Sequence, residues 1–386
     1  MARRIQALRS HVPRLWGFAL EHLLLLPLGA AIALVWANTN PESYFQFTYA
    51  ISFAVNDIAM VFFFALMTKE IVEATAPGGV LHPWHRAWLP VIAAVGATSV
   101  SALIHVRVVD ALDEPALRVA WPATSGTDIA LSYFVARIIS RGHSIVPFGL
   151  LLAIASDALG ILAIALFQPV PDLHLVQGAM IMAVAIGIAA ILRRARVKSF
   201  WPYLVGAGSV SWYAFFRSGI HPALALVPIM PFLPHAARDP GFFVDARPDA
   251  KDTLSHFEIV WRHPAQIALL LFGLVNAGVP FHALEPGTFG LPIAMIVGKP
   301  LGVLLGAGVA IAAGLHLPHH VGWRELIVVG FAAAIGFSVA LFFSAALLPP
   351  GQLRAETSMG ALLSLVAAPL ALSSARLLGV GRFARS

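Results

Sequence analysis

The stretch VAWPATSGTDIALSYF, residues 119–134, places residues that an ideal membrane helix would not carry inside a long apolar region. Pro122 has no backbone N–H to donate, and Gly126 loosens the segment that follows. Asp128 adds a carboxylate. We therefore predict a helix that breaks here and presents its free ends and Asp128 to a cavity. The alternative is a proline kink with Asp128 as an ordinary N-cap.

The composition of the whole chain indicates a membrane protein. Of its 386 residues, 59% are hydrophobic and 11% are charged, whereas soluble domains have about 25% charged residues. Cysteine is absent, which excludes disulfides and thiolate chemistry. The net charge of +6 comes from basic residues at predicted helix ends and not from a continuous patch, so nucleic acid is not an expected partner. The chain has no Walker, GxSxG or HExxH motif, so we predict neither an enzyme nor a need for a cofactor.

The apolar runs predict an all-α membrane protein, a single domain over residues 1–386 with about twelve membrane helices, because a helix satisfies its own backbone hydrogen bonds in lipid. The predicted segments are 16–37, 56–76, 87–106, 118–138, 146–168, 174–193, 200–216, 219–234, 256–278, 288–313, 323–348 and 356–377. The first is expected to be a retained helix, because it has no clear small-residue cleavage site.

The distribution of Lys and Arg predicts the orientation in the membrane. With the N-terminus inside, the outer loops hold only Arg107, Arg118, Arg217 and Arg354. We therefore expect a multi-pass protein of the bacterial inner membrane with both termini in the cytoplasm. Residues 1–15 then form a basic cytoplasmic N-terminus, and residues 234–255 form a cytoplasmic loop.

Four charged residues in the predicted membrane segments are singled out as candidates for a role inside the membrane: Asp57, Asp128, Asp157 and Lys299. A charge at mid-bilayer costs at least about 2.5–3.5 kcal/mol, so such residues usually face water or a partner. Asp157 is interpreted either as a carboxylate that exchanges a proton for a cation, or as an acid kept protonated to donate to a neighbouring helix. Lys299 is either a proton carrier or a side chain that reaches an interface. Asp57, at a predicted helix start, suits an N-cap better than a carrier.

A second interrupted segment, GFAAAIGFSVALFF (330–343), pairs with the break near Gly126. One interrupted helix in each half of the chain indicates an inverted-repeat transporter whose two broken helices cross at mid-membrane. Two further features are weaker. Lys69 and Glu73, four residues apart, are interpreted as an ion pair on one helix face. His221 has either a structural or a pH-tuning role, or none.

Several motifs resemble those of the NhaA-type sodium/proton antiporters, in the family's order and at similar spacing. They are VND (55–57), VFFFAL (61–66), LPVIAAVGA (89–97), TDIAL (127–131), LLAIASDALGILAIALF (151–167), RSGIHPAL (217–224), NAGVP (276–280), IVGKPLGV (296–303) and VVGFAAAIGFSVALF (328–342). The resemblance extends over about residues 50–375. It implies two unwound helices that cross beside an ion site, and it alone implies a homodimer.

Residue by residue, Thr127 and Asp128 match the family's unwound Thr-Asp pair, Asp157 matches its ion-binding aspartate and Lys299 its essential lysine. The resemblance implies that the lysine balances the negative ends of the broken helices and that Asp128 balances the positive ends. The first of the family's two adjacent aspartates is replaced here by Ser156, which removes the lysine's usual partner.

A second departure lies in the family's cytoplasmic motif, which is MTKEIVE here (67–73). It has Lys69 in place of a glutamate and keeps Glu73, which changes the charge of the segment linked to the family's pH response. Glu73 and His221 are therefore the candidate pH-response residues.

These observations predict a secondary antiporter that exchanges sodium, or lithium, for protons in pH and sodium homeostasis. Asp157 binds the Na⁺ and the proton in turn, and Ser156 and nearby carbonyls complete an oxygen shell. With a single carboxylate, exchange is expected to be closer to electroneutral than in relatives with two aspartates. The alternatives are a transporter of another substrate, such as an organic anion coupled to sodium, and a non-transporting membrane sensor or scaffold.

Overall fold

The computed structural model describes residues 25–76, 88–139, 145–167, 174–235, 252–318 and 321–384, and these residues form helices and connecting segments without strands. The α-helices are α3 (Leu25–Thr39), α4 (Pro41–Phe53), α5 (Met60–Thr75), α6 (Trp88–Ala111), α7 (Ile129–Ile139), α8 (Ile145–Phe167), α9 (Leu175–Arg194), α10 (Ser209–Ser218), α11 (Thr253–Asn276), α12 (Gly290–Ala312), α13 (Trp323–Ala333), α14 (Phe337–Leu347), α15 (Gln352–Leu363) and α16 (Ala367–Leu378). The π-helices are η1 (Ala54–Ala59) and η4 (Tyr203–Gly208). The 3₁₀ segments are η3 (Pro115–Ser125), η5 (Pro222–Leu224), η6 (Met230–Phe232), η7 (Phe281–Ala283), η8 (Pro286–Phe289), η9 (Ser364–Val366) and η10 (Gly381–Phe383).

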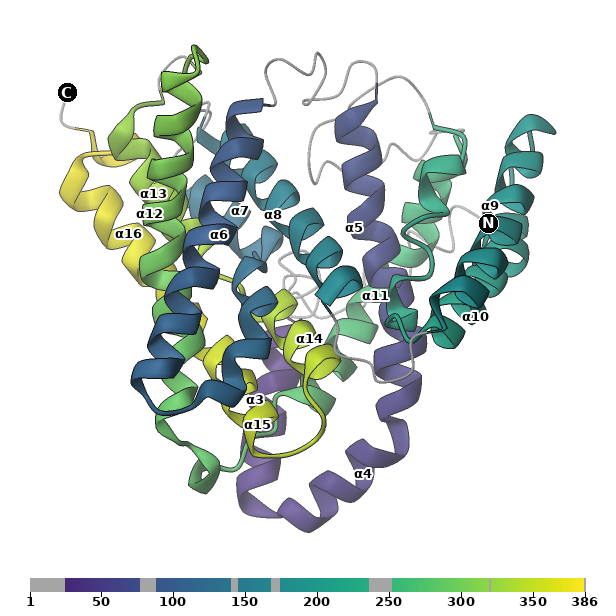
Figure 1. Ribbon diagram of the computed structural model, residues 1–386, viewed down its shortest axis with the longest axis horizontal. Coiled ribbons are helices and arrows are strands. Elements are labelled where there is room, and N and C mark those ends of the chain that lie inside the picture. Colours follow the sequence, from purple (N-terminus) through teal and green to yellow (C-terminus); the bar gives the residue numbers. More distant parts are fainter. Residues whose placement is uncertain are drawn as a thin grey trace, which may run out of the picture.

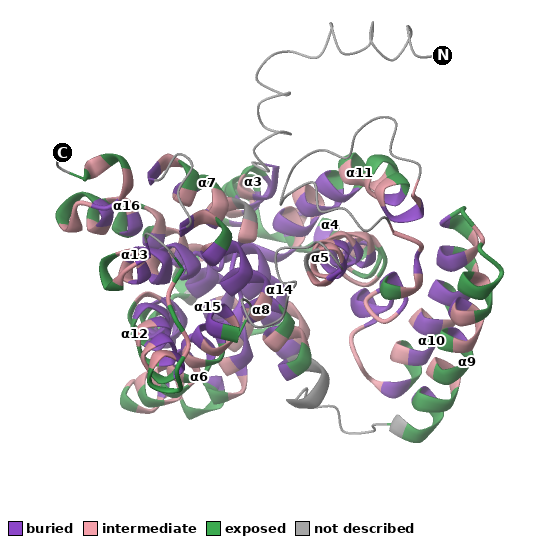
Figure 2. Cartoon of the chain, turned by 90° about the horizontal axis from the view of Figure 1, so that it is seen from above, coloured by how far each residue is buried: buried purple, intermediate pink, exposed green. Residues whose placement is uncertain are grey.

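The helices pack as two groups (Figure 1). We call η3, α6, α7, α8 and α12 to α16 the crossing bundle, because it contains both interrupted helices. We call α3, α4, α5, α9, α10 and α11, with η1, η4, η5 and η6, the flanking bundle. Between the two groups, α11 packs against α14. The view from above separates the crossing bundle from α9 and α10 (Figure 2).

The most extensive helix pairing joins α6 and α12 inside the crossing bundle. Gly302 and Gly306 of α12 lie so close to α6 that a Cβ on Gly306 would come within 2.6 Å of Ile92 O. Small residues four positions apart let membrane helices approach in this way. This close pairing fixes α12 and therefore the position of Lys299.

The perimeter of the molecule is apolar, as expected for a surface that faces lipid. Large hydrophobic side chains such as Val184 of α9 and Val309 of α12 are 57% and 64% exposed. Exposed apolar surface on this scale marks a membrane or partner contact. Six described helices are long and apolar enough to cross a membrane, or seven if the bent pair α13 and α14 counts as one span. The chain is therefore a multi-pass membrane protein, and the number twelve is not confirmed.

The segment predicted as helix 56–76 begins earlier than expected. Asn40 caps α4, because its side chain accepts a hydrogen bond from Ser43 N, and Pro41 occupies the first turn, where no backbone donor is lost. The helical run then continues through η1 into α5, from Pro41 to Glu73. The interpretation of Asp57 as an N-cap is therefore wrong, since it lies inside η1. π-helical turns inside α-helices are rare, and those that occur frequently lie at functional sites.

No α-helix forms over the predicted segment 219–234, which contains only η5, turns and η6. Pro222, Pro228 and Pro231 each remove a backbone donor and prevent a regular helix. The predicted basic N-terminus, residues 1–15, and most of the predicted loop 234–255 lie outside the described residues.

Candidate ion-binding site

The two interrupted helices cross at their breaks. The first stops at Ser125 and resumes as α7 after Gly126, Thr127 and Asp128. The second breaks between α13 and α14, which are bent by 48°. Asp128 N donates to Ile335 O at 2.6 Å, so the two breaks hydrogen-bond directly. Both predicted interruptions, and their crossing, are confirmed.

The crossing depends on two glycines. A Cβ on Gly126 would lie 3.0 Å from Ala340 N and from Val339 Cβ. A Cβ on Gly336 would collide with Gly126 O and with the Met295 side chain. Only hydrogen atoms fit between the two breaks, so the crossing requires glycine at both positions.

Lys299 lies under the crossing and is 1% exposed. Its Nζ donates to Ser125 O at 3.0 Å, Gly126 O at 2.5 Å and Ala333 O at 2.9 Å. These carbonyls belong to the C-terminal ends of η3 and α13, where the helix dipoles are negative. A cation at this point stabilises both broken ends. Between Lys299 and Asp157, both of them described, there is no ion pair.

Thr127 links the parts of the site. Its hydroxyl accepts a hydrogen bond from Lys299 Nζ at 2.9 Å and donates to Ala333 O at 3.1 Å. Its backbone N donates to Asp157 Oδ1 at 2.9 Å. Thr127 therefore connects the lysine, the second broken helix and the buried carboxylate.

Asp157 is 1% exposed in the middle of α8. Its Oδ1 accepts the bond from Thr127, whereas its Oδ2 is buried with no hydrogen-bond partner. A buried carboxylate oxygen without a partner is costly unless it carries a proton or binds a cation. The geometry therefore suits an acid that holds one or the other.

Ser156 is also 1% exposed, and its hydroxyl has no hydrogen-bond partner. Ser156 precedes Asp157 on α8, and successive side chains leave an α-helix about 100° apart. The structure brings together Thr127, Asp157 and Lys299, and it connects Ser156 to none of them through a hydrogen bond.

Asp128 lies at the start of α7 and is 6% exposed. Its Oδ1 accepts a hydrogen bond from Leu131 N at 3.0 Å, which is the geometry of an N-cap. A carboxylate at this end also balances the positive end of the α7 dipole. Asp128 therefore both caps α7 and balances the positive end of its dipole.

A cavity of about 160 Å³ leads to the crossing, and we call it the α5–α11 cavity. Thr127, Asp128 and Ser338 line it at the crossing, while Glu70 and Glu258 line it at the C-terminal end of α5. Asp157 does not line this cavity, but Thr127 does, and Thr127 N donates to Asp157. A polar route thus comes within one hydrogen bond of the buried acid.

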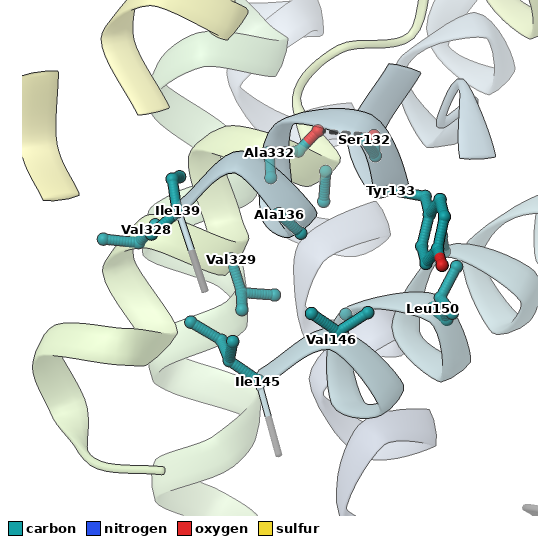
Figure 3. A pocket seen from close by; sticks show the side chains of 13 residues that line it. Ser132, Tyr133, Ala136, Ile139, Ile145, Val146, Leu150, Val328, Val329 and Ala332 are labelled. Atoms are coloured by element: carbon teal, nitrogen blue, oxygen red, sulfur yellow. Dashed lines mark hydrogen bonds between the residues drawn. The ribbon is translucent and has the colours of Figure 1, made fainter. Parts of the chain in front are cut away.

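A second, much smaller void lies on another side of α7. It has a volume of about 20 Å³, lies between α7, α8 and α13, and is lined mostly by apolar side chains such as Ile139, Ile145 and Val329 (Figure 3). The bond from Ser132 Oγ to Ala332 O, 2.6 Å long, ties α7 to α13 beside this void. An apolar void offers water no partners, so the α5–α11 cavity is the better route for an ion.

A charged cluster lies at the mouth of the α5–α11 cavity. Lys69, whose side chain is 3% exposed, contacts Glu73 at 2.6 Å, Glu258 at 2.8 Å and Glu70 at 3.3 Å. The predicted pair of Lys69 and Glu73 is present. The sequence analysis missed Glu258, which lies near the N-terminal end of α11. This end was expected on the same side of the membrane as Lys69, and that shared side could have suggested the contact.

His221 lies at the other end of the molecule, at the start of η5. Its Nδ1 accepts a hydrogen bond from Ala223 N at 3.3 Å and lies 4.0 Å from Asp57 Oδ1. Its ring packs against Phe342, with 5.0 Å between the ring centroids. His221 is therefore separate from the crossing, and Glu73 belongs to the cluster at the cavity mouth.

Two interrupted helices that cross around buried charges define a class of membrane protein found among secondary transporters. Residues 20–374 match the family model described as Na⁺/H⁺ antiporter 1. The chain is 40% identical to a protein named Na(+)/H(+) antiporter NhaA from Desulfitobacterium hafniense, over 94% of this chain and 96% of the relative. It is 37% identical to a protein of the same name from Geotalea uraniireducens, over 93% and 96%.

A solved structure supports the fold independently. The sodium proton antiporter MjNhaP1 from Methanocaldococcus jannaschii aligns with a TM-score of 0.60 at 15% identity, covering 93% of this chain and 92% of that one. At this identity the likeness concerns the fold alone. The family model and the relatives show that the chain belongs to the Na⁺/H⁺ antiporter 1 family.

Proposed function

We propose that this protein exchanges Na⁺ for H⁺ across the bacterial inner membrane and that Asp157 binds the two in turn. The observation that carries the proposal is the buried Asp157 carboxylate, which has one oxygen bonded to Thr127 N and the other without a partner. The names of the relatives support sodium and protons as the substrates. We also propose that both termini lie in the cytoplasm and that the protein acts as a homodimer.

Loss of the proton makes Asp157 a negatively charged ligand, and oxygen ligands suit a small hard cation such as Na⁺. Carbonyl oxygens at the breaks and Ser156 Oγ complete the shell in this proposal. Lys299 holds the crossing together, because its Nζ binds the ends of η3 and α13. Asp128 holds the start of α7 in place.

Each cycle then replaces one proton by one Na⁺ at a single carboxylate. The charge carried in one direction equals the charge carried in the other, so exchange is electroneutral. Ser156 is the reason, because a serine hydroxyl adds no second titrating group at neutral pH.

The test uses purified protein in proteoliposomes that contain a pH-sensitive dye. Addition of Na⁺ should cause a proton flux in the wild type and none in Asp157→Asn. The matched control is Asp110→Asn, which makes the same chemical change at a partly exposed pair with Arg118 far from the crossing. It should retain exchange.

Exchange by Asp157→Asn would remove Asp157 as the carrier. A wild type without any cation-dependent pH change at any pH would support a non-transporting homologue instead. Li⁺, K⁺ and organic anions added in turn define the substrate. Proteolysis of terminal tags in vesicles tests the orientation, and the mass of the detergent-solubilised protein tests the homodimer.

A further inference from the structure

A hydrogen bond joins the two bundles at the end of the molecule opposite Lys69, and a second bond supports it from within the flanking bundle. Arg354 of α15, in the crossing bundle, donates from Nη2 to Asn276 Oδ1 at 2.6 Å. Asn276 is the last residue of α11, in the flanking bundle, and its Nδ2 donates to Asn56 Oδ1 at 2.8 Å. Asn56 lies in η1 of the same bundle. We call Arg354, Asn276 and Asn56 the Arg354 clasp.

Arg354 is a partly buried cation whose hydrogen-bond partner in the clasp is a neutral amide. Asn276 is 6% exposed, and Arg354 forms no ion pair with any carboxylate in the described part of the chain. A hydrogen bond from a charged donor is stronger than a neutral one, but a carboxylate partner would add a full opposite charge. Separating Arg354 from Asn276 therefore strands no buried anion, which makes the contact reversible.

Space for this movement is present. Arg354 and Asn276 line a cavity of about 420 Å³ between α4 and α15, together with Tyr44 and Ser358. A guanidinium released from Asn276 would enter this cavity, where polar groups and water can solvate it. The clasp can therefore open without moving the charge into an apolar region.

Aromatic rings close the gap between the bundles beneath the clasp. Phe342 of α14 is 1% exposed, and its ring lies 4.4 Å from Phe64 of α5 and 6.2 Å from Phe272 of α11, measured between centroids. Ser338, one turn earlier on α14, lines the α5–α11 cavity. The gap between the two bundles therefore holds a cavity from the Lys69 end to the crossing. Between the crossing and the Arg354 end, the ring of Phe342 fills it.

We propose that the Arg354 clasp is a latch that keeps this gap closed at the Arg354 end, and that Arg354 must leave Asn276 before Asp157 is exposed on that side. The inference rests on the proposed function, since only an exchanger needs to expose the acid to both sides in turn. Arg354 and Asn276 are positioning residues that act through the two bundles and do not touch the ion.

The experiment uses the absence of native cysteine. Ser338→Cys gives a single thiol in the α5–α11 cavity, and a membrane-impermeant maleimide labels it in everted or right-side-out vesicles. With the clasp intact, labelling should come from the Lys69 side. Arg354→Gln should lower that rate and raise labelling from the Arg354 side by roughly tenfold to a hundredfold, the factor for loss of one hydrogen bond from a charged donor.

Arg217→Gln is the matched control. Arg217 also donates to a neutral amide, Gln177 Oε1, at 3.3 Å, but both residues belong to the flanking bundle. In the Ser338→Cys protein, Arg217→Gln should leave the labelling rate unaltered from either side of the membrane. Equal effects of Arg217→Gln and Arg354→Gln would overturn the latch.

Asn276→Asp provides a test with the opposite sign and does not depend on the folding of Arg354→Gln. It turns the contact into an ion pair, so labelling from the Arg354 side should fall below the wild-type level. A labelling rate like that of the wild type, or a higher one, would overturn the proposal. A merely structural role predicts loss of folded protein in both variants and no opposite shifts.

Repeating the labelling in the Asp157→Asn background separates the two proposals. Opposite shifts together with exchange by Asp157→Asn would support the latch and reject the carrier. Unchanged labelling together with loss of exchange would reject the latch and leave the carrier in place.

Discussion

Replacing Thr127 with valine tests how the crossing is held together. Valine has nearly the same shape but lacks the hydroxyl, so the bond from Lys299 Nζ and the bond to Ala333 O are both lost. The backbone N–H that binds Asp157 remains. A hydrogen bond to a charged group contributes about 1.5–3 kcal/mol and a neutral one about 0.5–1.5 kcal/mol.

The expected destabilisation is therefore roughly 2–4.5 kcal/mol, a large share of the 5–15 kcal/mol typical of a folded protein. Ala333 O keeps its bond from Lys299, which favours the lower part of this range. The free energy of unfolding would be measured by SDS titration in mixed micelles, with Thr127→Ser as the control. Serine restores the hydroxyl and should be close to the wild type.

Exchange gives a second readout for the same variants. Thr127→Val should exchange Na⁺ for H⁺ more slowly than the wild type but measurably, because Asp157 keeps its backbone donor. Stability equal to that of Thr127→Ser would refute the bonding role of the hydroxyl. Complete loss of exchange with normal stability would instead identify the hydroxyl as a ligand of the ion.

Three further changes test other parts of the structure. Ser156→Asp adds a second acid, so exchange should generate a membrane potential that a voltage-sensitive dye detects, whereas Ser156→Ala should remain electroneutral; a potential in the wild type would contradict the one-carboxylate cycle. Gly336→Ala forces a methyl group against Gly126 O and Met295 and should lower the unfolding free energy by about 1–3 kcal/mol; a wild-type value would show that the breaks can separate freely. Lys69→Met leaves Glu70, Glu73 and Glu258 without their shared cation and should lower the free energy of unfolding by roughly 3 kcal/mol. Lys69→Arg keeps the charge and should lower it less. Equal losses in the two variants would show that the charge is unimportant.

Local sequence was sufficient to predict the interruptions. Pro122 and Gly126 cannot continue an apolar helix normally, and their effect needs no distant partner. Asp157 and Lys299 were recognisable for the same reason, because a charge inside an apolar run is costly wherever the run packs. The Lys69 and Glu73 pair followed from four-residue spacing on one helix.

Long-range contacts were beyond local patterns. The run from Pro41 to Glu73 continues through η1, where the sequence suggested a helix start at Asp57. The segment 219–234 is apolar enough for a membrane helix, yet its prolines and its burial against neighbouring helices leave only turns. Hydropathy measures whether a segment avoids water and does not decide its backbone geometry.

The sequence by itself determined that the chain enters a membrane, where its helices break and which charges lie between them, because each follows from residues close together in the chain. Only the tertiary structure decided which carbonyls Lys299 binds at the ends of η3 and α13, that Glu258 joins Lys69, and that Arg354 reaches Asn276. These pairings depend on how helices far apart in sequence are brought together. Asn56 and Asn276, for example, are separated by 220 positions, and no periodicity in either segment specifies the other.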